Sequence, residues 1–126
     1  MKRITGIGGI FFKAKEPEKL RKWYKDHLGI PTSSDGFGFE WRDKSNPDDL
    51  GMTVWSIFPQ DTKYFGNQNL SFMLNYRVEN LDRVLEELRS EGVIVEEKIQ
   101  EYDFGRFAWL TDPEGNRIEL WEPKKK

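Results

Sequence analysis

The sequence contains no cysteine and one histidine, and both shortages exclude classes of chemistry. Without cysteine the chain cannot form disulfides, thiolate zinc sites, iron–sulfur clusters or a cysteine nucleophile. The single histidine, His27, excludes any site that needs two imidazoles from one chain, and a Ser–His–Asp triad would depend on it alone. The composition therefore argues against thiol chemistry and against the commonest metal sites.

Excess positive charge and long apolar runs are also lacking. The chain of 126 residues has 20 Lys and Arg against 22 Asp and Glu, whereas binding to nucleic-acid phosphates needs a basic surface. No stretch approaches the roughly 18 apolar residues of a membrane span, and the first residues lack the apolar segment of a signal peptide. We expect a cytoplasmic protein of one domain, with neither nucleic acid nor a membrane as its partner.

Aromatic residues, in contrast, are abundant. They make up 14% of the chain, with five Trp and nine Phe. Aromatic side chains fill small cores, but they also line ligand pockets. Composition alone does not distinguish these two uses.

Hydrophobic periodicity predicts two helices and several strands. One helix begins at Pro17 and ends at Gly29, and the other follows the N-cap Asn80 and ends at Gly92. We expect a loop at residues 43–51 and a connector at 61–69. The predicted strands cover residues 4–14, 37–41, 52–58, 70–78, 93–95, 105–110 and 117–121.

The order β-α-β-β-β recurs along the chain at a spacing near 64 residues. Ala14 and Val78 correspond at this spacing, and so do Pro59 and Pro123. We therefore expect one domain, 1–126, built of a module at 4–60, the connector at 61–69 and a second module at 70–123. Two unrelated αβ segments with generic patterning are the alternative.

Two segments carry a resemblance to a known family. Residues 6–12, GIGGIFF, run into WYKDHLGI at 23–30, and this resembles the opening of the vicinal oxygen chelate superfamily, which includes glyoxalase I, bleomycin-resistance proteins and extradiol dioxygenases. FGR at 104–106 and TDPEGNRIEL at 111–120 resemble its closing hairpin. The resemblance implies an α+β fold of two βαβββ modules whose curled mixed sheets surround a cavity, with helices outside, and it implies a homodimer.

Strand alternation predicts which residues face that cavity, because successive side chains of a strand point to opposite faces. One predicted face is almost wholly apolar, and the other mixes aromatics with a few polar groups, as ligand cavities do. This second face could instead be a dimer interface or a wet surface. The expected ligand-binding residues on this face are Phe11, Trp55, Met73, Asn75, Glu119 and Trp121, and Arg106 is expected to contact the ligand from the mouth of the cavity.

The resemblance also implies four metal-ligand positions, and here these positions are Gly9, Trp55, Met73 and Glu119. Only Glu119 is a ligand that hard cations prefer, since glycine has no side chain, indole is a donor only and a thioether is a poor ligand. A lone carboxylate does not hold a divalent ion against water. We therefore expect no metal and no other cofactor.

Glu119 is the candidate for chemistry that remains. Burial among aromatic side chains raises the pKa of a carboxyl group, so Glu119 is a candidate general base, or it contacts a cationic ligand. A structural ion pair with Arg77, Arg106 or Arg117 is the alternative.

The sequence thus favours a metal-independent small-molecule-binding protein of glyoxalase or bleomycin-resistance type, acting as a homodimer. The first alternative is a metal-free lyase or isomerase of the same superfamily with Glu119 as its base. The second is a partner-binding module without a cavity. The sequence does not name the ligand, because this fold serves many functions.

Overall fold

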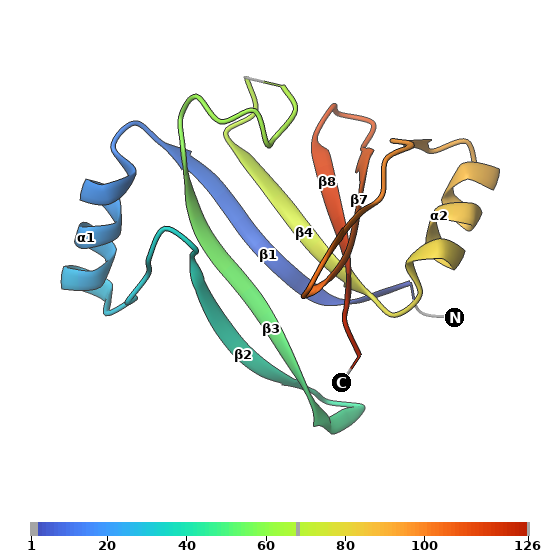
Figure 1. The fold of residues 1–126 in the computed structure, drawn as a ribbon, viewed down its shortest axis with the longest axis horizontal. Coiled ribbons are helices and arrows are strands. Elements are labelled where there is room, and N and C mark those ends of the chain that lie inside the picture. The colour runs from blue at the N-terminus through green and yellow to red at the C-terminus, as the bar shows by residue number, and fades with distance from the viewer. Residues whose placement is uncertain (1–2, 68, 126) are drawn as a thin grey trace. The chain divides into compact units, whose positions relative to one another are not determined.

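The computed structural model describes residues 3–67 and 69–125. The chain divides into two compact units: the first unit, Gly9–Met73, and the second unit, Met1–Gly8 with Leu74–Lys126. Each unit combines one helix with β-strands, and each contains both parallel and antiparallel strand pairs. The predicted α+β fold class is confirmed (Figure 1).

The first unit is organised around its longest strand. It contains β1 (Ile4–Ala14) from Gly9 onward, α1 (Pro17–Leu28), β2 (Phe37–Asp43) and β3 (Asn46–Pro59). β3 pairs in parallel with β1 and antiparallel with β2. Residue Ile10 lies beside Trp55, and Phe12 lies beside Ile57, in the parallel pair.

The second unit repeats this plan with additional short strands. Its elements are β4 (Phe72–Val78) from Leu74 onward, α2 (Leu81–Ser90), β5 (Ile94–Val95), β6 (Gln100–Tyr102), β7 (Gly105–Thr111) and β8 (Arg117–Pro123). β8 pairs in parallel with β4 and antiparallel with β7, and β7 also pairs with β5 and β6. The parallel β4–β8 pair therefore corresponds to the β1–β3 pair of the first unit.

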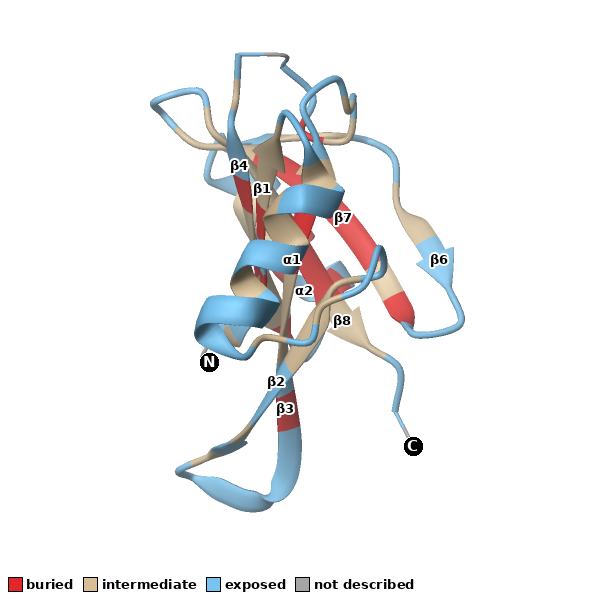
Figure 2. Ribbon diagram, turned by 90° about the vertical axis from the view of Figure 1, so that its left-hand side faces the viewer, coloured by how far each residue is buried: buried red, intermediate tan, exposed pale blue. Residues whose placement is uncertain are grey.

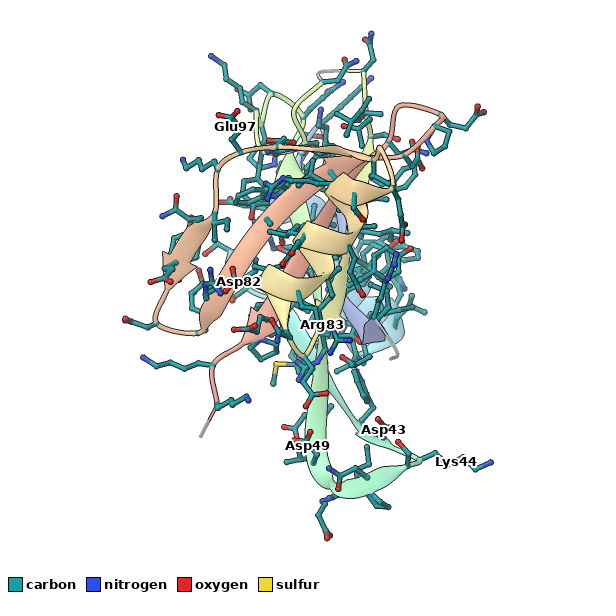
Figure 3. All side chains as sticks on the ribbon, turned by 90° about the vertical axis from the view of Figure 1, so that its right-hand side faces the viewer. Asp43, Lys44, Asp49, Asp82, Arg83 and Glu97 are labelled. Atoms are coloured by element: carbon teal, nitrogen blue, oxygen red, sulfur yellow. The ribbon has the colours of Figure 1, made fainter. Side chains whose placement is uncertain are left out.

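The predicted loop at residues 43–51 is wrong. β3 begins at Asn46, so β2 and β3 form one long hairpin, and Figure 3 shows Asp43, Lys44 and Asp49 near its tip. The cause is cross-strand packing. The Trp41 ring occupies the space where Gly51 has no side chain, and the Trp41 indole N–H donates to Thr53 Oγ1 at 2.9 Å. These contacts override the turn preference of the NPDD segment.

The two helices are packed to different degrees. α2 begins after Asn80, whose side chain accepts from the backbone N–H of Arg83 at 3.1 Å, as the sequence predicts. It buries Leu81, Val84 and Leu85 in a cluster with residues of β7 and β8. α1 begins at Pro17 but has no buried residue (Figure 2). Within the described residues, no helix is long and apolar enough to cross a membrane.

Candidate functional site

Glu119 lies on the face of the second unit that is opposite α2. Leu120 and Ala108 belong to the α2 core, so their strand neighbours point to the other face. That face contains two aligned pairs, Asn75 beside Glu119 and Phe107 beside Trp121. We call it the Glu119 face, and its central residues are Asn75, Arg77, Phe107, Trp109, Glu119 and Trp121.

The Glu119 carboxylate is fully buried and held at both oxygens. Its side chain belongs to a residue that is 1% exposed. Oε1 accepts from Asn75 Nδ2 at 2.6 Å, and Oε2 accepts from the indole Nε1 of Trp109 at 2.9 Å. Hydrogen bonds to an ionised acceptor are stronger than neutral ones. The two donors therefore fix the carboxylate in one orientation.

Asn75 is itself positioned by close packing. Its side-chain Oδ1 is buried and accepts no hydrogen bond in the described structure. A Cβ on Gly8 would overlap Oδ1 and would lie 3.0 Å from Cε3 of Trp121. Only glycine leaves room for Asn75 to reach Glu119, and Oδ1 is left as a buried acceptor that a donor could satisfy.

Aromatic rings and guanidinium groups surround this carboxylate. Phe107 and Trp121 stack with centroids 5.8 Å apart and planes 5° apart. The Arg77 guanidinium lies 5.0 Å from the Trp121 ring, and the Arg117 guanidinium lies 5.0 Å from the Trp109 ring. Both distances are in the range of cation–π attraction. The Glu119 face thus combines apolar surface with a few oriented polar groups.

Arg117 forms an ion pair at the edge of this face. Its Nε and Nη2 donate to the two carboxylate oxygens of Glu96 at 2.8 and 2.7 Å. These hydrogen bonds hold the pKa of Glu96 below its ordinary value of 4.5. The pair fixes the guanidinium that covers Trp109.

Arg106, expected to contact the ligand, points away from the Glu119 face. It donates to both oxygens of Asp82 at 2.9 and 3.0 Å and lies 3.2 Å from Glu101. Asp82 lies on the first turn of α2 (Figure 3), and the hydrogen bonds from Arg106 keep its pKa below 3.8. Alternation accounts for this direction, since Arg106 lies between Gly105 and Phe107, which share the other face. A role of Arg106 in ligand binding stays a prediction.

Three predicted site residues belong to the first unit, and the predicted face of Trp55 is wrong. The Trp55 ring contacts Phe12 at 5.3 Å and Tyr24 of α1 at 4.8 Å. Phe11 is buried on the opposite face, 5.4 Å from the Phe58 ring. The register causes this, because β1 places Ile10, and not Phe11, on the face of Trp55. Met73 is also fully buried.

The residues present do not fit the divalent metal that the superfamily resemblance implies. Both oxygens of Glu119 already accept hydrogen bonds, and their donors are an amide and an indole. Among residues 3–67 and 69–125, no group of three or more His, Cys, Asp or Glu side chains could hold a metal ion. An indole N–H cannot be a ligand, and one carboxylate with one amide oxygen is too few for a stable site.

A concave surface lies elsewhere, in the first unit. It encloses about 570 Å³ beside the end of β1 and the first turns of α1. Its lining combines three lysines with aromatic and aliphatic side chains: Lys13, Ala14, Lys15, Glu16, Lys19, Leu20, Trp23 and Tyr24. None of these residues was expected to bind the ligand.

Sequence reasoning missed Trp109 and Phe107, which complete the Glu119 face. The turn between β7 and β8 was the sequence signal that could have identified them, because it sets which residues of the two strands are neighbours. Asp112 accepts from the backbone N–H groups of Glu114 and Asn116, both at 2.9 Å, and the Asn116 side chain helps hold its pKa below 3.8. A turn fixed in this way sets the hairpin register, and the register places Trp109 beside Glu119.

Comparison with known proteins supports a family and a fold. Residues 9–121 match the family model of the glyoxalase-like domain. No curated protein matches the chain. Methylmalonyl-CoA epimerase from Mycobacterium tuberculosis is 20% identical, with a TM-score of 0.62, over 99% of this chain and 92% of that one.

Two further solved structures show the same fold. A Streptomyces coelicolor methylmalonyl-CoA epimerase variant in complex with 2-nitronate-propionyl-CoA is 15% identical, with a TM-score of 0.70, over 97% of this chain and 99% of that one. A structure described as an NAD-dependent benzaldehyde dehydrogenase from Legionella pneumophila is 17% identical, with a TM-score of 0.58, over 92% and 98%. At such identities the likeness concerns the fold alone.

Proposed function

The chain belongs to the glyoxalase-like domain family, in the vicinal oxygen chelate superfamily, and we propose that it binds a small organic molecule at the Glu119 face without a divalent metal. The observation that carries the proposal is the buried Glu119 carboxylate, held by Asn75 Nδ2 and Trp109 Nε1. A buried charge is costly unless it is hydrogen-bonded or paired. Each carboxylate oxygen can accept a second hydrogen bond, so this fixed carboxylate is a suitable partner for a ligand that donates one.

The composition of the face supports this binding role. Ligand sites are mostly apolar and contain a small number of oriented polar groups. Phe107, Trp109 and Trp121 supply the apolar surface, and Asn75 and Glu119 supply the polar groups. Asn75 Oδ1 is an additional acceptor that meets no donor among the residues that the structure describes, and this favours a ligand rich in N–H or O–H groups. Roles for Phe11, Trp55 and Met73 in ligand binding stay predictions.

An isomerase of the same superfamily is the second candidate. Several structures with this fold are described as methylmalonyl-CoA epimerases. If the chain were an isomerase, Glu119 would remove a proton from the ligand. Both oxygens of its carboxylate already accept hydrogen bonds from fixed donors, and this arrangement suits the orientation of a bound ligand better than proton abstraction.

We further propose a cytoplasmic homodimer of bleomycin-resistance type. α1 supports a second copy of the chain as partner, because it has no buried residue and exposes Trp23 and Leu28. Large exposed apolar patches mark association sites. Sedimentation at increasing concentration should show a dimer, and Trp23→Glu should weaken it.

A thermal-shift screen of small organic molecules tests the binding proposal. Ligands that bind the native state raise its melting temperature by mass action. Hits should lose most of their shift in Glu119→Gln and keep it in Phe39→Leu, a matched change of a half-exposed ring in the first unit. Shifts that persist in Glu119→Gln would contradict the proposal.

The enzyme alternative requires a separate assay. The chain is incubated with methylmalonyl-CoA in D2O, and exchange of the C2 proton is followed by NMR. We expect no exchange above the buffer rate. Exchange that disappears in Glu119→Gln while affinity is retained would establish the isomerase and replace the binding role.

A further inference from the structure

The concave surface beside α1 is positively charged, unlike the chain as a whole, and we call it the lysine groove. Its lining contains Lys13, Lys15 and Lys19 against one acid, Glu16, which leaves two net positive charges. The whole chain carries a net charge of −2. A concave surface lined by one sign of charge attracts ligands of the opposite sign. The lysine groove therefore favours an anionic occupant.

Glu16 is a weak competitor for these lysines. Its Oε1 lies 3.2 Å from Nζ of Lys19, and the two side chains are 65% and 80% exposed. An ion pair exposed to this degree contributes little to stability, because water and salt screen it. An anionic ligand can therefore replace Glu16 as the partner of Lys19 at low cost.

The walls of the lysine groove are held by packing within the first unit. The backbone N–H of Lys13 donates to the Ser71 carbonyl at 2.9 Å, which fixes the end of β1. The Lys13 ammonium lies 5.3 Å from the Phe65 ring centroid, and a neutral ring attracts this charge without cancelling it. On α1, the Tyr24 ring packs edge-on against Trp55 at 4.8 Å. A pre-formed wall of this kind loses little entropy when a ligand binds.

The size and the lining of the lysine groove favour a small molecule. The groove encloses about 570 Å³, and small-molecule sites in proteins enclose about 300–1,000 Å³. Leu20 and Tyr24 line it beside the lysines, so it offers apolar surface as well as charge. Trp23 also lines it, but Trp23 belongs to the surface that we propose for the dimer, and no contact with the ligand is assigned to it.

We propose that the lysine groove is a second binding site, which accepts a small organic anion. A carboxylate or phosphate group of the ligand would lie beside the lysines, and its apolar body would lie against Leu20 and Tyr24. This site goes beyond the proposed function of the Glu119 face, where a carboxylate and an amide oxygen favour ligands that donate hydrogen bonds. The two sites thus prefer ligands of opposite character.

Three probes test the second site: phenyl phosphate, inorganic phosphate and benzylammonium. NMR titration of the isotope-labelled full chain at neutral pH follows the backbone amides of residues 13–24. Phenyl phosphate should shift these amides and bind at least about threefold more tightly than inorganic phosphate, because its ring buries apolar surface. Benzylammonium should not shift them, because it combines a similar apolar body with the opposite charge.

Two double variants with the same change of charge locate the bound anion. Lys15→Gln/Lys19→Gln removes two exposed cations of the lysine groove and should weaken phenyl phosphate by about fivefold, the modest effect of exposed ion pairs. Lys44→Gln/Lys98→Gln removes two exposed cations elsewhere, one of them near the tip of the β2–β3 hairpin (Figure 3), and should leave the affinity unchanged. All four side chains are exposed, so both variants should fold.

The outcomes separate the second site from the Glu119 face. Equal binding of benzylammonium and phenyl phosphate, or no shift of residues 13–24 by phenyl phosphate, would overturn the second site. Equal weakening by the two double variants would show that net charge alone attracts the anion, and would also overturn it. Glu119→Gln should leave the affinity for phenyl phosphate unchanged. A loss of affinity in Glu119→Gln would assign the anion to the Glu119 face and overturn the second site alone.

Discussion

The two units share a strand plan but differ in what their parallel strand pairs present. In the second unit, Asn75 and Glu119 are neighbours on β4 and β8 and face away from α2. In the first unit, Ile10 and Trp55 are neighbours on β1 and β3, and Trp55 faces α1. Trp55 and Glu119 are 64 residues apart, yet they lie on opposite kinds of face. A shift of one residue in strand register is enough to move a side chain from the core face of a sheet to the face that carries the site.

The helices of the two units also differ in how closely they are packed. α2 closes a well-packed core, whereas α1 buries no residue. The second unit therefore has the features of a rigid support for a polar site, and the first unit has exposed apolar surface. Rigid support matters because a site must be held in its productive geometry.

The largest expected effect tests this difference in packing between α2 and α1. Leu85→Ala removes a fully buried side chain from α2 and should reduce the free energy of unfolding by about 2–5 kcal/mol. Leu28→Ala in α1 removes a side chain that is 60% exposed and should change it by less than about 0.5 kcal/mol. Urea unfolding measures both variants. Equal losses would contradict the contrast between the helices.

The next prediction concerns the indole that holds the carboxylate. Trp109→Phe removes the donor to Glu119 Oε2 and should cost about 1–3 kcal/mol of stability. Trp55→Phe reduces ring contacts with Phe12 and Tyr24 without touching a buried charge, so its loss should be smaller. Thermal unfolding compares the two variants. A larger loss in Trp55→Phe would show that the carboxylate does not depend on the indole.

A third test concerns the space beside Asn75. Gly8→Ala would place a Cβ on Oδ1 and force Asn75 to move, which should destabilise the chain by about 1–3 kcal/mol. Adding Asn75→Ala removes the overlapping atom, so the double variant should lose less than the sum of the two single variants. Simple additivity in urea unfolding would show that residues 8 and 75 are not coupled.

The smallest expected effect is a pH dependence. The pKa of Glu96 is lowered from 4.5 by Arg117, so the pair stabilises the folded chain above pH 4.5 and loses this contribution as the pH falls through the lowered value. Wild type should exceed Glu96→Gln in stability by a constant amount at neutral pH, and the difference should shrink below about pH 4.5. A stability difference between wild type and Glu96→Gln that grows as the pH falls would contradict this prediction.

The sequence was sufficient for most of the fold, because periodicity and caps are local signals. Pro17 and Asn80 begin the two helices as expected. The β2–β3 hairpin was missed at residues 46–51, where the packing of Trp41 on Gly51 overrides turn-forming residues. β6 was missed because its residues, Gln100, Glu101 and Tyr102, include no aliphatic side chain that would mark a strand.

The site was predicted less completely, because faces depend on register. Asn75, Glu119 and Trp121 were assigned to one face, and the structure brings them together. Trp55 was assigned to the wrong face, and Arg106, expected at the cavity mouth, donates to Asp82 of α2. Trp109 was missed because its contact with Glu119 depends on the pairing of two strands across the hairpin.

One measurement tests the central claim most directly: the indole N–H resonances of the isotope-labelled chain, titrated with an organic ligand from the thermal screen and separately with Mn²⁺. The account predicts that the ligand shifts the Trp109 and Trp121 resonances, and that stoichiometric Mn²⁺ broadens neither. Selective broadening of these two resonances by Mn²⁺ would show a metal site at Glu119 and contradict the account.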